Sequence, residues 1–82
     1  MNIIYRRGFY EQVADILDAA RKPILKTHLI HKANIEWKRM KFRLFFLQEK
    51  GLLVKIDNKY RTTRKGFLYL DAWHKLQDLM RR

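Results

Sequence analysis

The chain has 82 residues, of which 48% are hydrophobic and 13% aromatic, and its 19 Lys and Arg outnumber its eight Asp and Glu to give a net charge of +11. A chain of this length buries roughly 60% of its unfolded surface, which allows one small domain over residues 1–82, and its apolar content excludes a disordered basic tail. It has no cysteine and no serine, which excludes disulfides, thiolate metal sites and the commonest hydrolase nucleophile.

The location of the protein can be inferred from its apolar segments. No apolar run approaches the roughly 20 residues that span a bilayer. The first ten residues, MNIIYRRGFY, carry their charges after a very short apolar run, which is the wrong order for a signal peptide. We therefore expect a cytoplasmic protein.

The positive charge is concentrated in the middle of the chain. Residues 21–65 contain fourteen of the 19 basic residues but only three of the eight acidic ones, whereas both ends are nearly neutral. This distribution predicts a positive surface that binds a polyanion. A solvated surface that merely promotes solubility is the alternative.

The first half of the chain predicts two helices with a short apolar segment between them. Helical spacing of apolar residues indicates a helix over 8–22, which Pro23 ends. Ile24-Leu25 fits an isolated short strand, and Thr27 can cap a short helix over 27–33.

The second half predicts a longer helix, a β-hairpin and a last helix. Asn34 fits a turn and the N-cap of a helix over 35–50 that ends at Gly51. The segment 52–62 indicates a hairpin centred on Asp57-Asn58, and Thr63 can cap a last helix over 64–82.

The hairpin could form in two registers. A two-residue turn sets Ile56 opposite Lys59 and Val54 opposite Arg61, which mixes apolar and charged residues on one face. A three-residue turn sets Ile56 opposite Tyr60 and Val54 opposite Thr62, and leaves Lys55 and Arg61 together on the other face. We prefer the three-residue turn because it separates apolar from charged residues.

Two close-set helices followed by a charged hairpin indicate a winged helix-turn-helix, mainly α with a small β-hairpin. The pieces KT at 26–27, KAN at 32–34, EKGLL at 49–53, and Tyr60 with TRKG at 63–66 occur in an order and spacing that resembles the archaeal winged helix-turn-helix family of small DNA-binding proteins and transcriptional regulators, some of them viral. The resemblance covers roughly residues 9–76. It implies regulators or chromatin-like dimers whose last helix can pair two chains as a coiled coil, and hence a cytoplasmic protein associated with the nucleoid.

The helix over 35–50 has more than one apolar face. A helical wheel places Met40, Leu44 and Leu47 on the core side with Trp37 close beside them. Residues pointing away from the core, or flanking it, are expected in the major groove, which the early half of this helix enters in winged helices. These residues are Lys38, Arg39, Lys41, Phe42 and Arg43. A partly exposed packing role is the alternative for Phe42.

Further basic residues are expected to contact the DNA backbone or the minor groove. The hairpin supplies Lys55, Lys59 and Arg61, and the helix over 27–33 with its start supplies Lys26, Thr27 and Lys32. Phe45 and Phe46 fit neither core nor groove easily. We expect them to lie under residues 3–5, under the last helix or against a partner chain.

The last helix also has two apolar faces. Phe67 and Leu70 can pack on the chain's own core. The opposite face has a heptad seam with 3-4-3 spacing and two flanking residues, and predicts a homodimer. Its residues are Tyr69, Ala72, Trp73, Leu76, Leu79 and Met80. The alternative is a monomer in which this helix folds back over Phe45 and Phe46.

No other constellation predicts chemistry. His28 and His31 have a spacing that metals use, but without a nearby carboxylate or thiolate we expect no metal, and no cofactor or small-molecule ligand is evident. The scattered carboxylates do not indicate an enzyme. Besides double-stranded DNA binding in transcription, we keep RNA or ribonucleoprotein binding, non-specific DNA compaction and a protein adaptor role as alternatives.

Overall fold

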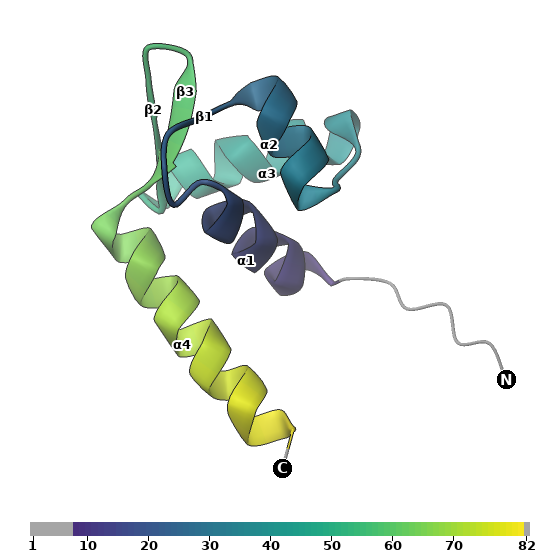
Figure 1. The fold of residues 1–82 in the computed structure, drawn as a ribbon, viewed down its shortest axis with the longest axis vertical. Helices are drawn as coiled ribbons and strands as arrows, with labels where there is room; N and C mark the ends of the chain where they lie inside the picture. The colour runs from purple at the N-terminus through teal and green to yellow at the C-terminus, as the bar shows by residue number, and fades with distance from the viewer. Residues whose placement is uncertain (1–7, 82) are drawn as a thin grey trace, which may run out of the picture.

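The computed structural model describes residues 8–81, which form helices packed around a small antiparallel sheet (Figure 1). The elements in chain order are α1 (Phe9–Ala19), β1 (Ile24–Leu25), α2 (Lys26–Ala33), α3 (Trp37–Glu49), β2 (Leu53–Ile56), β3 (Lys59–Thr62) and α4 (Arg64–Met80). The predicted fold class is confirmed: a mainly helical winged helix with the order α-β-α-α-β-β-α. Within the described residues, no helix is long and apolar enough to cross a membrane.

The first two helices end and begin at different residues from those predicted. α1 ends at Ala19 rather than at residue 22, because the carbonyl oxygen of Ala20 accepts a 2.8 Å hydrogen bond from the backbone N–H of Thr62 and ties the chain to the sheet. α2 begins directly after β1, with Leu25 as its N-cap and no capping side chain. The predicted cap at Thr27 is therefore wrong.

The turn between α2 and α3 also differs from the prediction. Asn34 has a left-handed backbone (φ 53°) and ends α2, so it does not cap α3. Ile35 is buried in the turn, and Glu36 occupies the N-cap position of α3. α3 ends at Glu49, and Gly51 follows with the positive φ of 73° that a glycine readily adopts.

Thr63 caps α4 as predicted: its hydroxyl accepts a 3.1 Å hydrogen bond from the N–H of Gly66. The same hydroxyl donates to the carbonyl oxygen of Gly51, 2.6 Å away, just beyond the end of α3. Lys65 donates from Nζ to the carbonyl oxygen of Lys50. Two side-chain hydrogen bonds thus join the start of α4 to the end of α3. The last helical residue is Met80, and Arg82 lies outside the described residues.

The sheet has the order β1-β3-β2, so β1 is not isolated: Ile24 lies opposite Tyr60. The preferred register of the hairpin is wrong. Asp57 and Asn58 form a two-residue turn with φ values of 50° and 67°, the left-handed pair that matches the twist of a tight hairpin. Ile56 lies opposite Lys59 and is 52% exposed, so the mixed face meets solvent.

The core lies between α1, α2, α3 and the start of α4. Its fully buried side chains include Ile16, Leu17, Leu29, Met40, Leu47 and Leu70. The core positions predicted on α3 are confirmed for Met40, Leu44 and Leu47, but Trp37 is 39% exposed. Leu70 packs on the core as predicted, whereas Phe67 is 38% exposed.

The two phenylalanines at 45 and 46 have different surroundings. Phe46 packs edge-to-face on Phe9 of α1, with ring centroids 5.0 Å apart, whereas Phe45 is 65% exposed. The C-terminal part of α4 extends beyond the other helices (Figure 1), and Phe45 stays exposed, so the alternative in which the last helix folds back over both phenylalanines is wrong for Phe45. The residues 3–5 that were expected to cover them lie outside the described residues.

Candidate nucleic-acid interface

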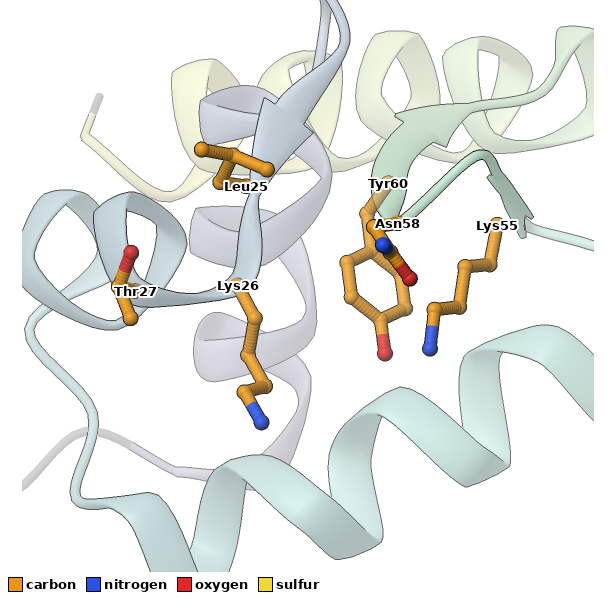
Figure 2. Close-up of a pocket in the computed structure, with 6 residues that line it drawn as sticks. All are labelled: Leu25, Lys26, Thr27, Lys55, Asn58 and Tyr60. Carbon is orange, nitrogen blue, oxygen red and sulfur yellow. The ribbon is translucent and has the colours of Figure 1, made fainter.

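The wing, which is the hairpin formed by β2 and β3, and the start of α2 line one pocket that faces α3. Figure 2 shows side chains from β2, β3 and the first turn of α2 directed toward α3. The pocket has a volume of about 230 Å³ and is lined by Leu25, Lys26, Thr27, Lys55, Asn58 and Tyr60. It therefore joins three residues predicted to contact nucleic acid, Lys26, Thr27 and Lys55, to three that were not.

The outer surface of α3 presents most of the residues predicted for the major groove. Lys38, Arg39 and Lys41 are exposed. Phe42 is 73% exposed, so within this chain it is not a packing residue. Together they form an exposed basic and aromatic surface on one helix.

Arg43 is the predicted groove residue that the structure places elsewhere. Its Nε donates a 3.1 Å hydrogen bond to Oε1 of Gln12, and its guanidinium lies 4.5 Å from the ring centroid of Phe9. Both partners belong to α1, and Gln12 is only 5% exposed. Arg43 thus joins α3 to α1.

Trp37 occupies the position at which α3 begins, beside the pocket. The Nζ of Lys26 lies 4.4 Å from its ring centroid and the Nζ of Lys41 lies 5.8 Å away. Attraction between an ammonium group and an aromatic face holds such a side chain in place without neutralising its charge. Two cations from different helices, Lys26 of α2 and Lys41 of α3, therefore lie near the Trp37 ring at the edge of the interface.

The two faces of the wing carry different residues because of the two-residue turn. Lys55 lies opposite Tyr60 and faces the pocket, while Arg61 lies opposite Val54 on the other face. Lys59 and Arg61 line a separate hollow with Pro23 and Ile56. The predicted pairing of Lys55 with Arg61 on one face is thus wrong.

The predicted residues of α2 are also separated. Lys26 and Thr27 line the pocket beside the wing. Lys32 instead lines a hollow with Asp15 and Asp18 of α1. The structure therefore does not bring Lys32 together with the other predicted nucleic-acid contacts.

The cations of the interface are not neutralised by neighbouring acids. Lys26, Lys38, Lys41 and Lys55 form no ion pair with any described residue, whereas Arg21 pairs with Asp18 and Lys75 with Asp71 elsewhere. The unpaired lysines give this surface its positive potential.

The predicted dimer seam is only partly exposed. Ala72, Leu76, Leu79 and Met80 are exposed, whereas Tyr69 and Trp73 are half-buried and pack against the chain's own core. Tyr69, Ala72, Trp73 and Leu76 line an apolar hollow with Tyr10 of α1, about 280 Å³ in volume. Toward the C-terminus, Leu76, Leu79 and Met80 are 50%, 71% and 76% exposed. The Tyr69 hydroxyl donates a 3.1 Å hydrogen bond to the carbonyl oxygen of Tyr10. Burial raises the pKa of Tyr69, and the nearby Tyr10 phenol raises it further.

Comparison with known proteins identifies the family. The sequence model described as winged helix-turn-helix matches residues 6–81. The chain belongs to the winged helix-turn-helix family. This confirms the resemblance found in the sequence.

One similar solved structure is the crystal structure of Sso10a-2, a DNA-binding protein from Sulfolobus solfataricus. The match has a TM-score of 0.80 and 24% sequence identity, and it covers 92% of this chain and 83% of that chain. At this identity the likeness establishes the shared fold. A search of curated protein sequences found no match.

Besides Leu25, three residues of this winged helix-turn-helix site were not predicted as site residues: Trp37, Asn58 and Tyr60. On a helical wheel Trp37 lies beside the apolar core stripe, so the sequence predicts a core residue rather than an exposed one. Tyr60 and Asn58 become pocket residues only in the two-residue register, because that register sets Tyr60 opposite Lys55. Asp57-Asn58 could have identified Tyr60, because this pair favours a two-residue turn and that turn sets Tyr60 opposite Lys55.

Proposed function

We propose that this protein binds double-stranded DNA as a transcriptional regulator, with α3 in the major groove and the wing on the backbone or in the minor groove. The observation that carries the proposal is the row of exposed cations on α3, Lys38, Arg39 and Lys41, which lie beside the wing and form no ion pair with a described residue. The winged helix-turn-helix family and the similar fold of Sso10a-2, itself described as a DNA-binding protein, support it. Such a protein would be cytoplasmic and associated with the nucleoid.

The residues have different roles in this proposal. Lys38 and Arg39 point outward from α3 and reach base edges, where Arg and Lys pair with guanine. Phe42 contacts a thymine methyl group. Lys26, Lys41 and Lys55 contact phosphates, which position the protein without reading sequence.

The test is an anisotropy titration of one labelled DNA duplex and its RNA equivalent across a salt series. Preference for DNA, with log affinity falling against log salt at a slope of roughly −5 to −9, supports several phosphate contacts. Arg39→Gln should weaken binding, while Lys75→Gln, the same loss of charge on α4, should change affinity much less. Equal effects of the two variants would contradict a localised interface on α3.

RNA binding is the second candidate, and one observation favours it. Phe42 and Phe45 are both largely exposed on α3, and exposed aromatic side chains stack on unpaired bases. Preference for RNA in the same titration would favour this function. Tight binding without sequence preference would instead favour DNA compaction, and salt-independent partner binding would favour an adaptor.

We further propose that two copies pair through α4. The residues proposed to form the seam are Tyr69, Ala72, Trp73, Leu76, Leu79 and Met80. Ala72, Leu76, Leu79 and Met80 are exposed, and Leu76 also lines the apolar hollow beside α1 together with the half-buried Tyr69 and Trp73. Two-fold pairing would present two α3 helices to one duplex and favour palindromic sites.

Sedimentation of a seam variant tests the dimer. Leu76→Glu should convert a dimer into a folded monomer, because it buries a carboxylate in an apolar contact. His74→Glu, on the polar side of the same helix, should remain dimeric. A wild-type protein that sediments as a monomer would contradict the pairing.

A further inference from the structure

We propose that the pocket between the wing and α2 binds one phosphate group, with the hydroxyl of Tyr60 donating a hydrogen bond to it. The inference rests on the proposed function, in which this phosphate belongs to the DNA backbone. It extends that function by assigning a defined anion site and a neutral ligand, Tyr60, that was not among the predicted contacts.

Tyr60 is the first observation. The residue is only 6% exposed and lies in β3, the central strand, opposite Ile24 of β1 and Lys55 of β2. Its hydroxyl forms no hydrogen bond with a described residue, although buried tyrosine hydroxyls usually find a partner. Every fully enclosed polar side-chain atom of the described residues has a partner, so the Tyr60 hydroxyl is not fully enclosed, and the residue lines the pocket.

The two lysines are the second observation. Figure 2 shows the ammonium groups of Lys26 and Lys55 and the phenol of Tyr60 directed the same way, toward α3. The Lys26 ammonium is held over the ring of Trp37 at 4.4 Å, and that of Lys55 lies 5.6 Å from the ring centroid of Tyr60. Aromatic faces thus hold both cations in place, no carboxylate lines the pocket, and their charges remain available for an anion.

The start of α2 is the third observation. Leu25, Lys26 and Thr27 form the N-terminal turn of this eight-residue helix and line the pocket. Because the N-cap is Leu25, no side chain caps the free N–H groups of the first turn. A helix N-terminus favours an anion through these groups and through its dipole.

The donor set and size of the pocket fit a phosphate. One phenol hydroxyl, two ammonium groups and the helix start lie around it, and Thr27 and Asn58 also line it. Its volume of about 230 Å³ is below the roughly 300–1,000 Å³ of pockets that enclose whole small molecules. A phosphate held here would fix the wing and α2 on one strand, and so set the position of α3 in the groove.

Tyr60→Phe tests the assignment because it removes only the hydroxyl. The variant should unfold at the same urea concentration as the wild type, since the hydroxyl has no partner in the free protein. Its affinity for the duplex should fall roughly ten-fold, the effect of one hydrogen bond to a charged group, with an unchanged salt slope because no charge is lost. Lys26→Gln and Lys55→Gln should each also reduce the salt slope by about one.

Tyr10→Phe is the matched control. It removes a phenol hydroxyl from a 65% exposed residue of α1 that does not line the pocket. Because Tyr10 lines the hollow beside the α4 seam, the variant is first sedimented, and at the oligomeric state of the wild type its duplex affinity should be unchanged. Wild-type affinity in Tyr60→Phe would overturn the proposal while leaving DNA binding intact.

Titration of the free protein with inorganic phosphate, followed by amide NMR at constant ionic strength, separates the two proposals. Shifts centred on residues 25–27 and 58–60 that vanish in Tyr60→Phe support the pocket. If these shifts appear but the protein binds no duplex, the pocket is a site for free phosphate and the proposed DNA binding is rejected. Shifts elsewhere only, or none, would overturn the pocket.

Discussion

Arg43 of α3 donates a 3.1 Å hydrogen bond from Nε to Oε1 of Gln12 in α1, and its guanidinium covers the ring of Phe9. The contact joins residues 31 positions apart in the sequence and lies partly buried. An arginine on the helix that we propose reads DNA therefore contributes to the packing of that helix on α1.

Substitution of Arg43 should consequently lower stability. Arg43→Met removes the hydrogen bond and the cation–π contact, and we expect the free energy of unfolding in urea to fall by about 1–2 kcal/mol. Arg39→Met, at an exposed position of the same helix, should leave stability within about 0.5 kcal/mol but weaken duplex binding. Equal stability of the two variants would contradict the role of Arg43 in packing.

The two threonines that the sequence suggested as helix caps should behave differently. Thr63 accepts from the N–H of Gly66 and donates to the carbonyl of Gly51, so Thr63→Ala should destabilise the domain by about 1–2 kcal/mol. Thr27→Ala removes no cap and should leave the thermal midpoint nearly unchanged. Differential scanning calorimetry of both variants tests this, and a larger loss from Thr27→Ala would reject the assigned caps.

Gly66 is required by the close approach of α4 to the turn after α3. A Cβ at this position would lie 2.5 Å from Cγ2 of Thr62 and closer still to the carbonyl oxygen of Leu52, which is backbone and cannot rotate away. Gly66→Ala should therefore destabilise by about 1–3 kcal/mol, although alanine is the better helix former. Arg64→Ala, an exposed change in the same turn, serves as control in urea denaturation and should shift stability by less than about 0.5 kcal/mol.

The sequence predicted features that depend on local periodicity. The apolar spacing that places Met40, Leu44 and Leu47 on one face reflects the geometry of a single helix, and these residues are buried. Thr63 was found because a cap requires only residues within one turn. The order of elements and the family followed from such local signals.

Features that depend on contacts between distant segments were not predicted correctly. Separation of apolar from charged residues favoured the wrong wing register, because that argument assumed a buried face where Ile56 in fact meets solvent. Trp37 was assigned to the core because a wheel cannot show that Lys26 of another helix approaches its ring. Arg43 was assigned to the groove because its partner Gln12 lies on α1.

The raised pKa of the Tyr69 phenol predicts that the folded domain loses stability at alkaline pH. Burial raises the pKa of Tyr69 above the ordinary value of about 10, and the Tyr10 phenol adds to the shift. Folding thus favours the protonated phenol, which donates to the carbonyl oxygen of Tyr10. This contribution is fully present below about pH 10, the pKa in the unfolded chain, and is lost as pH rises through the higher pKa of the folded chain.

Urea unfolding of the wild type and of Tyr69→Phe across pH 8 to 11.5 measures this contribution, at one fixed protein concentration because dimerisation would change the apparent stability. At about pH 8 the variant should be less stable by up to about 1 kcal/mol, the effect of one partly exposed hydrogen bond. Above about pH 10 the two curves should converge, because the ionised phenol no longer donates, while the lysines titrate equally in both proteins. Curves that stay parallel throughout would show that Tyr69 ionises alike in the folded and unfolded chains.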